Sequence, residues 1–373
     1  MSLEGRATQE GTARYRDRFP TASAEQHFRF EQGLWLSSVG VGTYLGKANE
    51  ETDRAYADAA ARAVELGANV IDTAANYRFQ RSERSIGAAL ARLTSGGGFN
   101  RDEIVVCTKG GYFPFDGEPP RDVRAYVEET FVRTGVIDFS DVAAGSHCMT
   151  PAYLRNQVAQ SLRNMGLAAI DVYYIHNPET QLSVVTRAEF ETRLSAAFEA
   201  LEGERAAGRI GYYGVATWNG FRAKQAGRDY HSLERMVELA RAAGGADSHG
   251  FRFIQLPFNL AMPEALVADN QTVEGARMST LEAARLLGVT AIASASIMQG
   301  KVARDLPEHV REPLGSLSTD AQTAIQFVRS TPGITTALVG MSRREHVEEN
   351  LQLARVAPAA ADDYRRLFEQ SGE

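Results

Sequence analysis

The sequence has few cysteines, no long hydrophobic run and no excess of basic charge. Only Cys107 and Cys148 occur among 373 residues, which argues against a disulfide framework and for a reducing compartment. No apolar stretch approaches the length of a transmembrane helix or a signal peptide, so we expect a cytoplasmic protein. The net charge of −7 argues against binding to nucleic acid or anionic membrane, because both require a basic face.

What the sequence does contain is a repeated alternation of short apolar runs with segments of helical spacing. The runs predict strands at residues 38–42, 69–72, 104–108, 170–175, 210–216, 253–256, 290–293 and 335–339. The helices that follow them are predicted at 53–66, 83–93, 151–165, 187–207, 233–243, 280–287, 319–329 and 343–353. This α/β pattern favours a closed (β/α)8 TIM barrel, although an open doubly wound sheet has the same local alternation.

Several segments fall outside this alternation. Residues 27–36 predict an N-terminal hairpin, and residues 359–368 predict an extra C-terminal helix. Residues 112–149, after the third strand, are rich in aromatics and predict a folded insertion near the active-site mouth, because functionless loops of that length are uncommon. This insertion would be either a wall or lid of the substrate pocket or a packed surface flap. We therefore expect a flexible leader over 1–26 and one barrel domain over 27–373.

Ionisable side chains stand at the ends of three predicted strands. They are Asp72, Lys109 and His176, and Tyr77 lies in the loop after the first of them. Each has a simpler structural interpretation: Asp72 as a turn cap, Lys109 as a solvated strand end, His176 as a hydrogen-bonded loop residue. Because the C-terminal ends of parallel barrel strands meet at one face, the four side chains are predicted to converge there.

The sequence around these residues resembles the aldo/keto reductase family, with the motifs in the order that the family requires. Segment 70–77 with Ser82-Glu83 and Ile86-Gly87 resembles its first motif, Thr108-Lys109 its lysine strand and segment 170–178 its histidine strand. Further matches are segment 209–215, segment 253–259, and segment 339–342 with Glu349-Asn350. The resemblance runs from about residue 40 to residue 353. It implies that Asp72, Tyr77, Lys109 and His176 form the catalytic group.

These residue types suit the reduction of a carbonyl group. Hydride transfer leaves an alkoxide that needs a proton, which the Tyr77 phenol can supply. The ordinary pKa of tyrosine, about 10, is high for that task at neutral pH. We expect the Lys109 ammonium to lower the pKa of Tyr77 and Asp72 to keep the lysine charged. His176 would donate a hydrogen bond to the carbonyl oxygen and fix its approach.

The resemblance implies a nicotinamide cofactor that lies extended across the barrel mouth. The glycines of segment 40–46 are spaced G-x-G-x-x-x-G, which does not match the Rossmann fingerprint. Arginines at a helix start just after Gly340 favour a phosphate, so NADPH (NADP+) is preferred over NADH. The implied cofactor contacts are Gly42, Thr43, Asp72, Ala216, Thr217, Gln255, Ser294, Gly340, Ser342, Arg343, His346, Glu349 and Asn350.

The sequence departs from the family pattern at a few of these contacts. Ala216 and Thr217 stand where the family often has Ser and Asn, and His346 stands where Gln is more frequent. Ser294 occupies a position at which many members have an aromatic that stacks on the nicotinamide ring. Either another aromatic, such as Trp218, covers that face, or the ring is held more loosely.

Three functions are compatible with these features. The leading hypothesis is NAD(P)H-linked reduction of a small aldehyde, ketone or sugar carbonyl, or the reverse oxidation. The second is an NADPH-binding sensor or accessory subunit with weak turnover, because some members of the family serve that way. The third is a Schiff-base lyase with Lys109 as nucleophile, which needs a lysine free of Asp72. No metal site is predicted, because adjacent His147 and Cys148 lack the usual ligand spacing.

Overall fold

The computed structural model describes residues 2–20, 26–96, 98–315 and 317–369. Eight parallel strands close into one barrel in the order β3–β4–β5–β6–β7–β8–β11–β12, with β12 pairing back to β3. Their bounds are β3 (Val39–Gly42), β4 (Val70–Asp72), β5 (Val105–Gly110), β6 (Ile170–His176), β7 (Ile210–Ala216), β8 (Phe251–Pro257), β11 (Thr290–Ser294) and β12 (Ile334–Gly340). The predicted (β/α)8 barrel is confirmed, and the closed sheet excludes the open doubly wound alternative.

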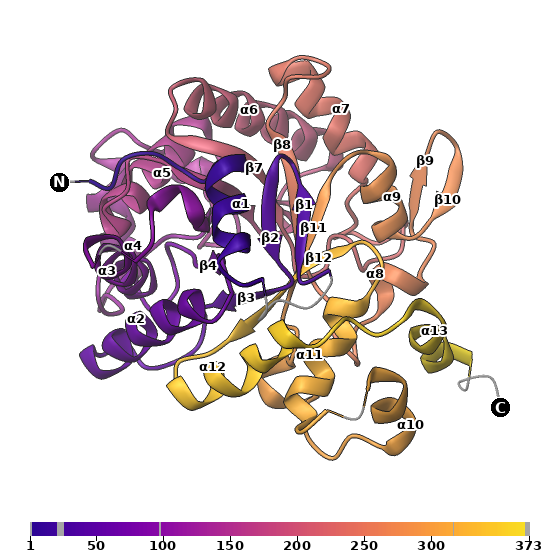
Figure 1. The fold of residues 1–373 in the computed structure, drawn as a ribbon. Helices are drawn as coiled ribbons and strands as arrows, with labels where there is room; N and C mark the ends of the chain where they lie inside the picture. Colours follow the sequence, from indigo (N-terminus) through magenta and orange to yellow (C-terminus); the bar gives the residue numbers. More distant parts are fainter. Residues whose placement is uncertain (1, 21–25, 97, 316, 370–373) are drawn as a thin grey trace.

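Helices surround the barrel, as Figure 1 shows. The predicted ones are present as α2 (Glu50–Glu65), α3 (Arg81–Ser95), α5 (Pro151–Met165), α6 (Arg187–Ala206), α7 (Leu233–Gly244), α9 (Thr280–Leu286), α11 (Asp320–Ser330) and α12 (Arg344–Asn350). Helix α13 (Ala361–Glu369) confirms the extra C-terminal helix. Within the described ranges, no helix combines the length and the hydropathy needed to cross a membrane.

Burial on both faces explains why the strands were visible in the sequence. One side of the sheet fills the barrel with side chains such as Tyr174, Phe253 and Leu338, and the other packs against the helices. Strands buried on both faces read as continuous apolar runs. The short hairpin β9 (Gln271–Val273)–β10 (Ala276–Met278) and the helices α8 (Glu264–Val267) and α10 (Glu308–Arg311) were not predicted, because three or four residues show no periodicity.

The N-terminal end of the barrel is covered by a hairpin and a helix. The hairpin β1 (Phe28–Glu31)–β2 (Leu34–Ser37) confirms the prediction for residues 27–36. Helix α1 (Gln9–Asp17) lies beside β2 within the segment expected to be a flexible leader. Residues 21–25 of that segment lie outside the described residues.

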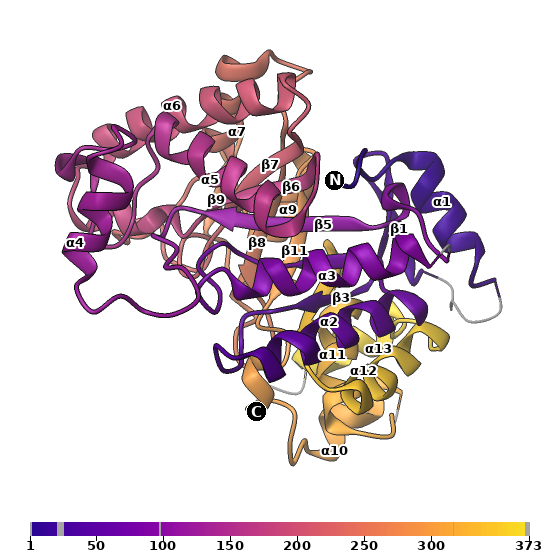
Figure 2. The same cartoon turned by 90° about the vertical axis from the view of Figure 1, so that its left-hand side faces the viewer.

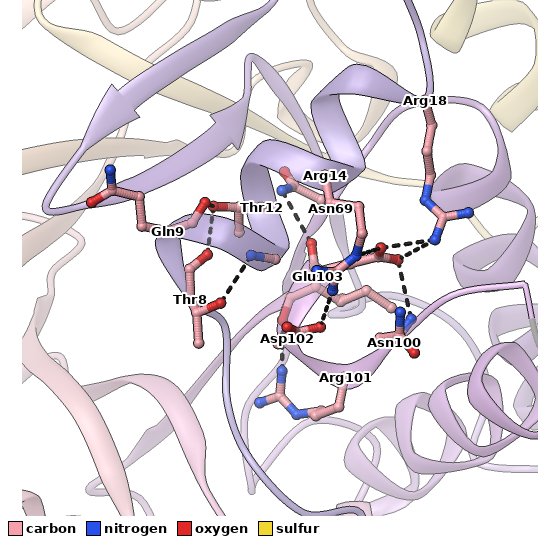
Figure 3. A network of polar contacts seen from close by, with 12 residues as sticks. Thr8, Gln9, Thr12, Arg14, Arg18, Asn69, Asn100, Arg101, Asp102 and Glu103 are labelled. Atoms are coloured by element: carbon pink, nitrogen blue, oxygen red, sulfur yellow. Dashed lines mark hydrogen bonds and ion pairs between the residues drawn. The ribbon is translucent and has the colours of Figure 1, made fainter.

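Helix α1 is docked on the barrel rather than free. Tyr15 is fully buried, and its hydroxyl donates to the carbonyl oxygen of Val64 at 2.6 Å. Arg14 and Arg18 both pair with Glu103, at 2.7 and 2.8 Å (Figure 3). A Cβ at Gly11 would collide with the backbone oxygen of Asp102, so this helix depends on glycine for its close approach. The N-terminal segment was expected to be flexible, but its helix α1 is docked. The helix is largely polar, and it is held by ion pairs with a segment that is distant in sequence.

The insertion over residues 112–149 forms a small cluster of its own. It contains α4 (Val123–Val127), a π-helical turn (Glu128–Val132) and a 3-10 turn (Phe139–Asp141). Phe113 stacks on Phe131 with ring centroids 5.4 Å apart, and Tyr153 of α5 packs edge-on against both. Figure 2 shows α4 at the end to which the strand arrows point, opposite α1. Most aromatics of the insertion thus form a packed flap. Tyr112 differs from them, because it lines the cavity at the C-terminal ends of the barrel strands that is described below.

Candidate active site

A cavity of about 810 Å³ lies at the C-terminal ends of the barrel strands. Seven of the eight strands contribute a lining residue at or near their last position: Gly42, Asp72, His176, Ala216, Gln255, Ser294 and Gly340. This is the end of a (β/α)8 barrel at which active sites are built. The cavity is within the usual size range of small-molecule and cofactor sites.

Lys109 lies beneath this cavity in a fully paired, buried position. Its side chain is 1% exposed, and its Nζ lies 2.5 Å from Asp72 Oδ1 and donates to the Thr73 carbonyl oxygen at 2.9 Å. The other carboxylate oxygen of Asp72 accepts from Gln255 Nε2 at 2.8 Å. The interpretations of Lys109 as a solvated strand end and as a nucleophile free of Asp72 are therefore both wrong.

The buried pair keeps its lysine charged. Burial alone would lower the pKa of Lys109, but Asp72 and Tyr77 together outweigh burial and raise it. Burial also raises the pKa of Asp72, against the opposing effect of Lys109. A protonated lysine is consequently fixed at the bottom of the site at neutral pH.

Tyr77 and His176 complete the predicted group. The Tyr77 ring centroid lies 4.8 Å from Lys109 Nζ and 5.7 Å from the His176 ring, to which it is nearly perpendicular at 76°. Tyr44 also packs against Tyr77, with ring centroids 5.0 Å apart. The structure thus brings together all four side chains of the predicted catalytic group, from β4, the loop after it, β5 and β6.

The direction of the Tyr77 pKa shift differs from the sequence-based expectation. Burial raises the pKa of Tyr77 above its ordinary value, and the lowering effect of Lys109 does not outweigh burial. The expected net lowering of this pKa is therefore wrong, because the same burial that strengthens the lysine's field also disfavours the phenolate. Tyr77 is a neutral phenol at neutral pH, which is the form that donates a proton.

His176 is neutral as well. Burial, followed by the charge of Lys109, lowers the pKa of His176 well below its ordinary value. Its Nδ1 is buried and has no hydrogen-bond partner in the described part of the chain. A neutral imidazole carries one N–H, so His176 can donate one hydrogen bond without bringing a charge.

With this geometry in view, the comparison with known families is decisive. A model of the aldo/keto reductase family matches residues 38–239, more than half of the chain. The chain belongs to the aldo/keto reductase family.

The curated relatives that the chain matches are distant in sequence. A D-threo-aldose 1-dehydrogenase of a Pseudomonas species is 27% identical over 184 residues, 49% of each chain. An NADH-specific methylglyoxal reductase of Escherichia coli is 32% identical over 150 residues, which are 38% of this chain and 39% of the relative. These two matches span half or less of the relatives' lengths. A putative voltage-gated potassium channel subunit beta of Schizosaccharomyces pombe is 23% identical over 363 residues, 89% of this chain and 91% of that one.

Solved aldo/keto reductases share the fold. An enzyme from Klebsiella pneumoniae, solved with NADP and acetate, has a TM-score of 0.62 at 17% identity, and the match covers 93% of this chain and 95% of that one. One from Bacillus halodurans has a TM-score of 0.61 at 20% identity, with coverage of 92% and 95%. At these identities the likeness establishes the common barrel.

The predicted cofactor contacts of this aldo/keto reductase separate into two groups. Those lining the cavity are Gly42, Thr43, Asp72, Ala216, Thr217, Gln255, Ser294, Gly340 and His346. Ser342, Arg343, Glu349 and Asn350 do not line it. Arg343 is exposed at the start of α12, whereas Glu349 accepts from Thr319 Oγ1 at 2.8 Å and Asn350 is buried. The second group lies on or next to α12, of which His346 is the residue that lines the cavity.

Several lining residues were not predicted from the sequence. They are Tyr44, Leu45, Asn76, Asn177, Leu338, the segment 295–300 and Arg304. Asn76 and Tyr44 are next in sequence to the predicted residues Tyr77 and Thr43, and this proximity was the only sequence feature that could have placed them in the site. The segment 295–300 is a loop after β11 without periodicity, so only the fold places it over the mouth. Trp218 and Ser294 both line the cavity, and Trp218 is 46% exposed.

His147 ties the insertion to the strand that carries His176. Its Nε2 lies 2.8 Å from the His176 carbonyl oxygen, and its Nδ1 lies 2.8 Å from Gln181 Nε2. Nε2 therefore donates and Nδ1 accepts, which defines a neutral imidazole. Burial lowers the pKa of His147 to about 4.

We expect His147 to make the protein acid-sensitive. Because its folded pKa of about 4 lies below the ordinary value of 6.5, the unfolded state binds more protons between these values. The stability from the neutral imidazole is complete above about pH 6.5 and is lost as pH falls to about 4, a total of about 3 kcal/mol. Urea unfolding at a series of pH values measures this change in the free energy of unfolding. In His147→Gln the stability lost between pH 6.5 and pH 4 should be smaller by about 3 kcal/mol. If the free energy of unfolding of His147→Gln depends on pH as in the unmodified protein, the assignment is contradicted.

Proposed function

We propose that the protein is an NAD(P)H-dependent oxidoreductase that reduces an aldehyde, ketone or sugar carbonyl to an alcohol, or catalyses the reverse. The observation that carries this proposal is the buried Asp72–Lys109 pair beneath Tyr77 and His176 at a single cavity. The names of two relatives, an aldose dehydrogenase and a methylglyoxal reductase, support this class of substrate.

The cavity fits an extended nicotinamide dinucleotide. Its lining runs from Tyr77 and His176 to Gly340 and His346, and it includes Thr217, whose buried Oγ1 has no partner among the described residues. Thr217 and Gln255 would hold the carboxamide end, and the residues after Gly340 the phosphate end. When bound, the cofactor supplies the hydride. NADP complexes of solved family members favour NADPH, and the NADH-specific relative keeps NADH open as a substitute.

The chain's own residues supply the proton and the polarisation. Tyr77, a neutral phenol, donates its proton to the carbonyl oxygen as that oxygen gains charge. The ammonium of Lys109 stabilises the phenolate that remains, and Asp72 keeps this ammonium protonated and oriented. His176 donates a hydrogen bond to the same oxygen from a fixed, water-poor position.

Turnover of a panel of aldehydes tests the proposal. The purified protein should quench or shift NADPH fluorescence on binding and should oxidise NADPH when methylglyoxal, an aldose or an aromatic aldehyde is added. Protein that binds no nicotinamide cofactor and oxidises none with any of these carbonyls would contradict it.

The match to a putative potassium channel subunit beta favours a second candidate, because it spans 89% of this chain. In that case the protein is an NADPH-binding sensor or accessory subunit with weak turnover. Saturable NADPH binding with slow turnover that Tyr77→Phe leaves unchanged would favour this candidate over the reductase.

Arg343 offers a test of cofactor preference. We expect Arg343→Ala to weaken NADPH binding about tenfold and NADH binding less than about twofold, because a charged hydrogen bond to the extra phosphate is lost. Arg344→Ala is the matched control, since Arg344 already pairs with Glu348 at 2.9 Å. Titration of cofactor fluorescence measures both. Equal losses for NADPH and NADH would argue against a phosphate contact at Arg343.

A further inference from the structure

Glu179 links the strand of the proposed catalytic histidine to the loop after β7. It lies in the 3-10 turn Pro178–Ser183, directly after β6, and its side chain is 8% exposed. Its Oε1 accepts hydrogen bonds from two consecutive backbone N–H groups, those of Trp218 at 2.8 Å and Asn219 at 3.0 Å. One carboxylate therefore fixes the backbone from which the Trp218 side chain extends.

His231 lies behind this carboxylate. Its imidazole is buried, with Nε2 3.5 Å from Glu179 Oε2, and it stacks on Phe190 at 5.3 Å with an interplanar angle of 3°. The backbone N–H of His231 donates to the Gly220 carbonyl oxygen at 2.8 Å, and a Cβ at Gly220 would collide with the imidazole ring. The turn after Trp218 thus rests directly on His231, and only glycine allows so close a contact.

The Glu179 side chain is ionised in this setting. Burial would raise the pKa of Glu179, but the adjacent His231 and the backbone N–H donors outweigh burial and lower it below its ordinary value. A buried carboxylate is costly unless it is paired and hydrogen-bonded. Here the buried carboxylate holds the loop after β7 through the backbone N–H groups of Trp218 and Asn219.

Trp218 and its neighbour Thr217 are the residues of this loop that line the cavity, and Trp218 is the aromatic one. Strand β7 lies between β6 and β8, so Trp218 stands between the strand ends that carry His176 and Gln255. Tyr44 and Tyr112 line the same cavity, and Tyr112 packs on the His176 ring with centroids 5.2 Å apart. A half-exposed indole on a loop held by buried polar groups offers a flat apolar face to the cavity that Tyr77 and His176 line.

We propose that Trp218 is a specificity-determining wall of the substrate subsite, selecting carbonyl compounds with a flat apolar substituent, and that the Glu179–His231 pair positions it. The substrate half of this inference rests on the proposed reductase function. The positioning half does not, because it concerns only the order of the indole side chain.

Fluorescence tests the positioning half without any turnover. The chain has two tryptophans, so Trp35→Phe leaves Trp218 as the single probe. In that background, Glu179→Ala should raise acrylamide quenching of Trp218 about twofold, because the freed loop exposes the indole more often. Glu179→Gln, whose amide oxygen still accepts hydrogen bonds, should restore most of the protection. Quenching that is unchanged in Glu179→Ala overturns the positioning role.

A second buried carboxylate provides the matched control. Glu204 of α6 is 2% exposed and pairs with Arg209 at 2.5 Å. Arg209 immediately precedes β7, and neither residue lines the cavity. Glu204→Ala loses a comparable buried charge, so it should leave Trp218 quenching at the level of the Trp35→Phe parent. Equal increases in Glu179→Ala and Glu204→Ala would show general loosening and overturn the proposal.

Kinetics tests the specificity half. Trp218→Ala and Glu179→Ala should each raise the KM for benzaldehyde about tenfold and the KM for methylglyoxal less than about threefold, because methylglyoxal has no flat ring to lose the contact. An equal rise for both aldehydes overturns the specificity role. If the unmodified protein reduces neither aldehyde, the reductase function and the substrate half fall together, while the quenching result still decides the positioning half.

Discussion

Replacing Tyr77 by Phe is expected to lower kcat for carbonyl reduction by about three orders of magnitude. The ring would keep its contacts with Lys109 and Tyr44, so the cofactor should bind within about twofold of its original affinity. The variant loses only the hydroxyl that gives its proton to the developing alkoxide. Steady-state oxidation of NADPH with a good aldehyde substrate measures the change in kcat, and cofactor fluorescence measures the binding.

Tyr126→Phe is the matched control for this variant. The Tyr126 hydroxyl donates to the Pro114 carbonyl oxygen at 2.8 Å within the insertion and does not line the cavity. Its loss should change kcat by less than about twofold. A Tyr77→Phe protein with the kcat of the Tyr126→Phe control would remove Tyr77 from the reaction and would favour the accessory-subunit candidate.

Removing the charge of Lys109 is expected to destabilise the fold as well as the reaction. In Lys109→Met the Asp72 carboxylate stays buried and keeps Gln255 as its partner but loses its counter-ion. Such a change costs about 3–5 kcal/mol in free energy of unfolding. It should also abolish detectable turnover, because the phenolate of Tyr77 loses the ammonium that stabilises it. Urea denaturation measures the first effect and NADPH oxidation the second.

The double variant Lys109→Met, Asp72→Asn separates lost pairing from lost packing. With the carboxylate neutralised, we expect about half or more of the lost unfolding free energy to return while activity stays absent. If the two changes are simply additive in stability, the ion pair does not contribute to the fold as inferred here.

The barrel could be predicted from the sequence because its strands are buried on both faces. Runs such as those in β6 and β7 are almost continuously apolar, and helices such as α5 carry a clear apolar face. Helix α1 could not be predicted in the same way. It is held by Arg14 and Arg18 on Glu103, more than eighty residues away, and such pairing leaves no local pattern.

The four residues of the proposed catalytic group could be predicted from the sequence, but their electrostatics and much of the cavity lining could not. Asp72, Lys109 and His176 each stand at or next to the last residue of a strand, and the motifs around them place Tyr77 in the same group. The direction of the Tyr77 pKa shift depends on burial against the field of Lys109, which the sequence does not show. Glu179 and His231 belong to no motif. Their proximity to each other and the hydrogen bond of Glu179 to the Trp218 backbone appear only in three dimensions.

The most direct test of the central claim is isotope transfer from the cofactor. The protein is incubated with NADPH dideuterated at C4 of the nicotinamide and with benzaldehyde, and the alcohol is analysed by mass spectrometry and NMR. The account predicts one deuterium on the carbinol carbon of each alcohol molecule formed, with no detectable labelled product in the Tyr77→Phe protein over the same time. Alcohol formed without deuterium, or the same labelled yield from both proteins, would contradict it.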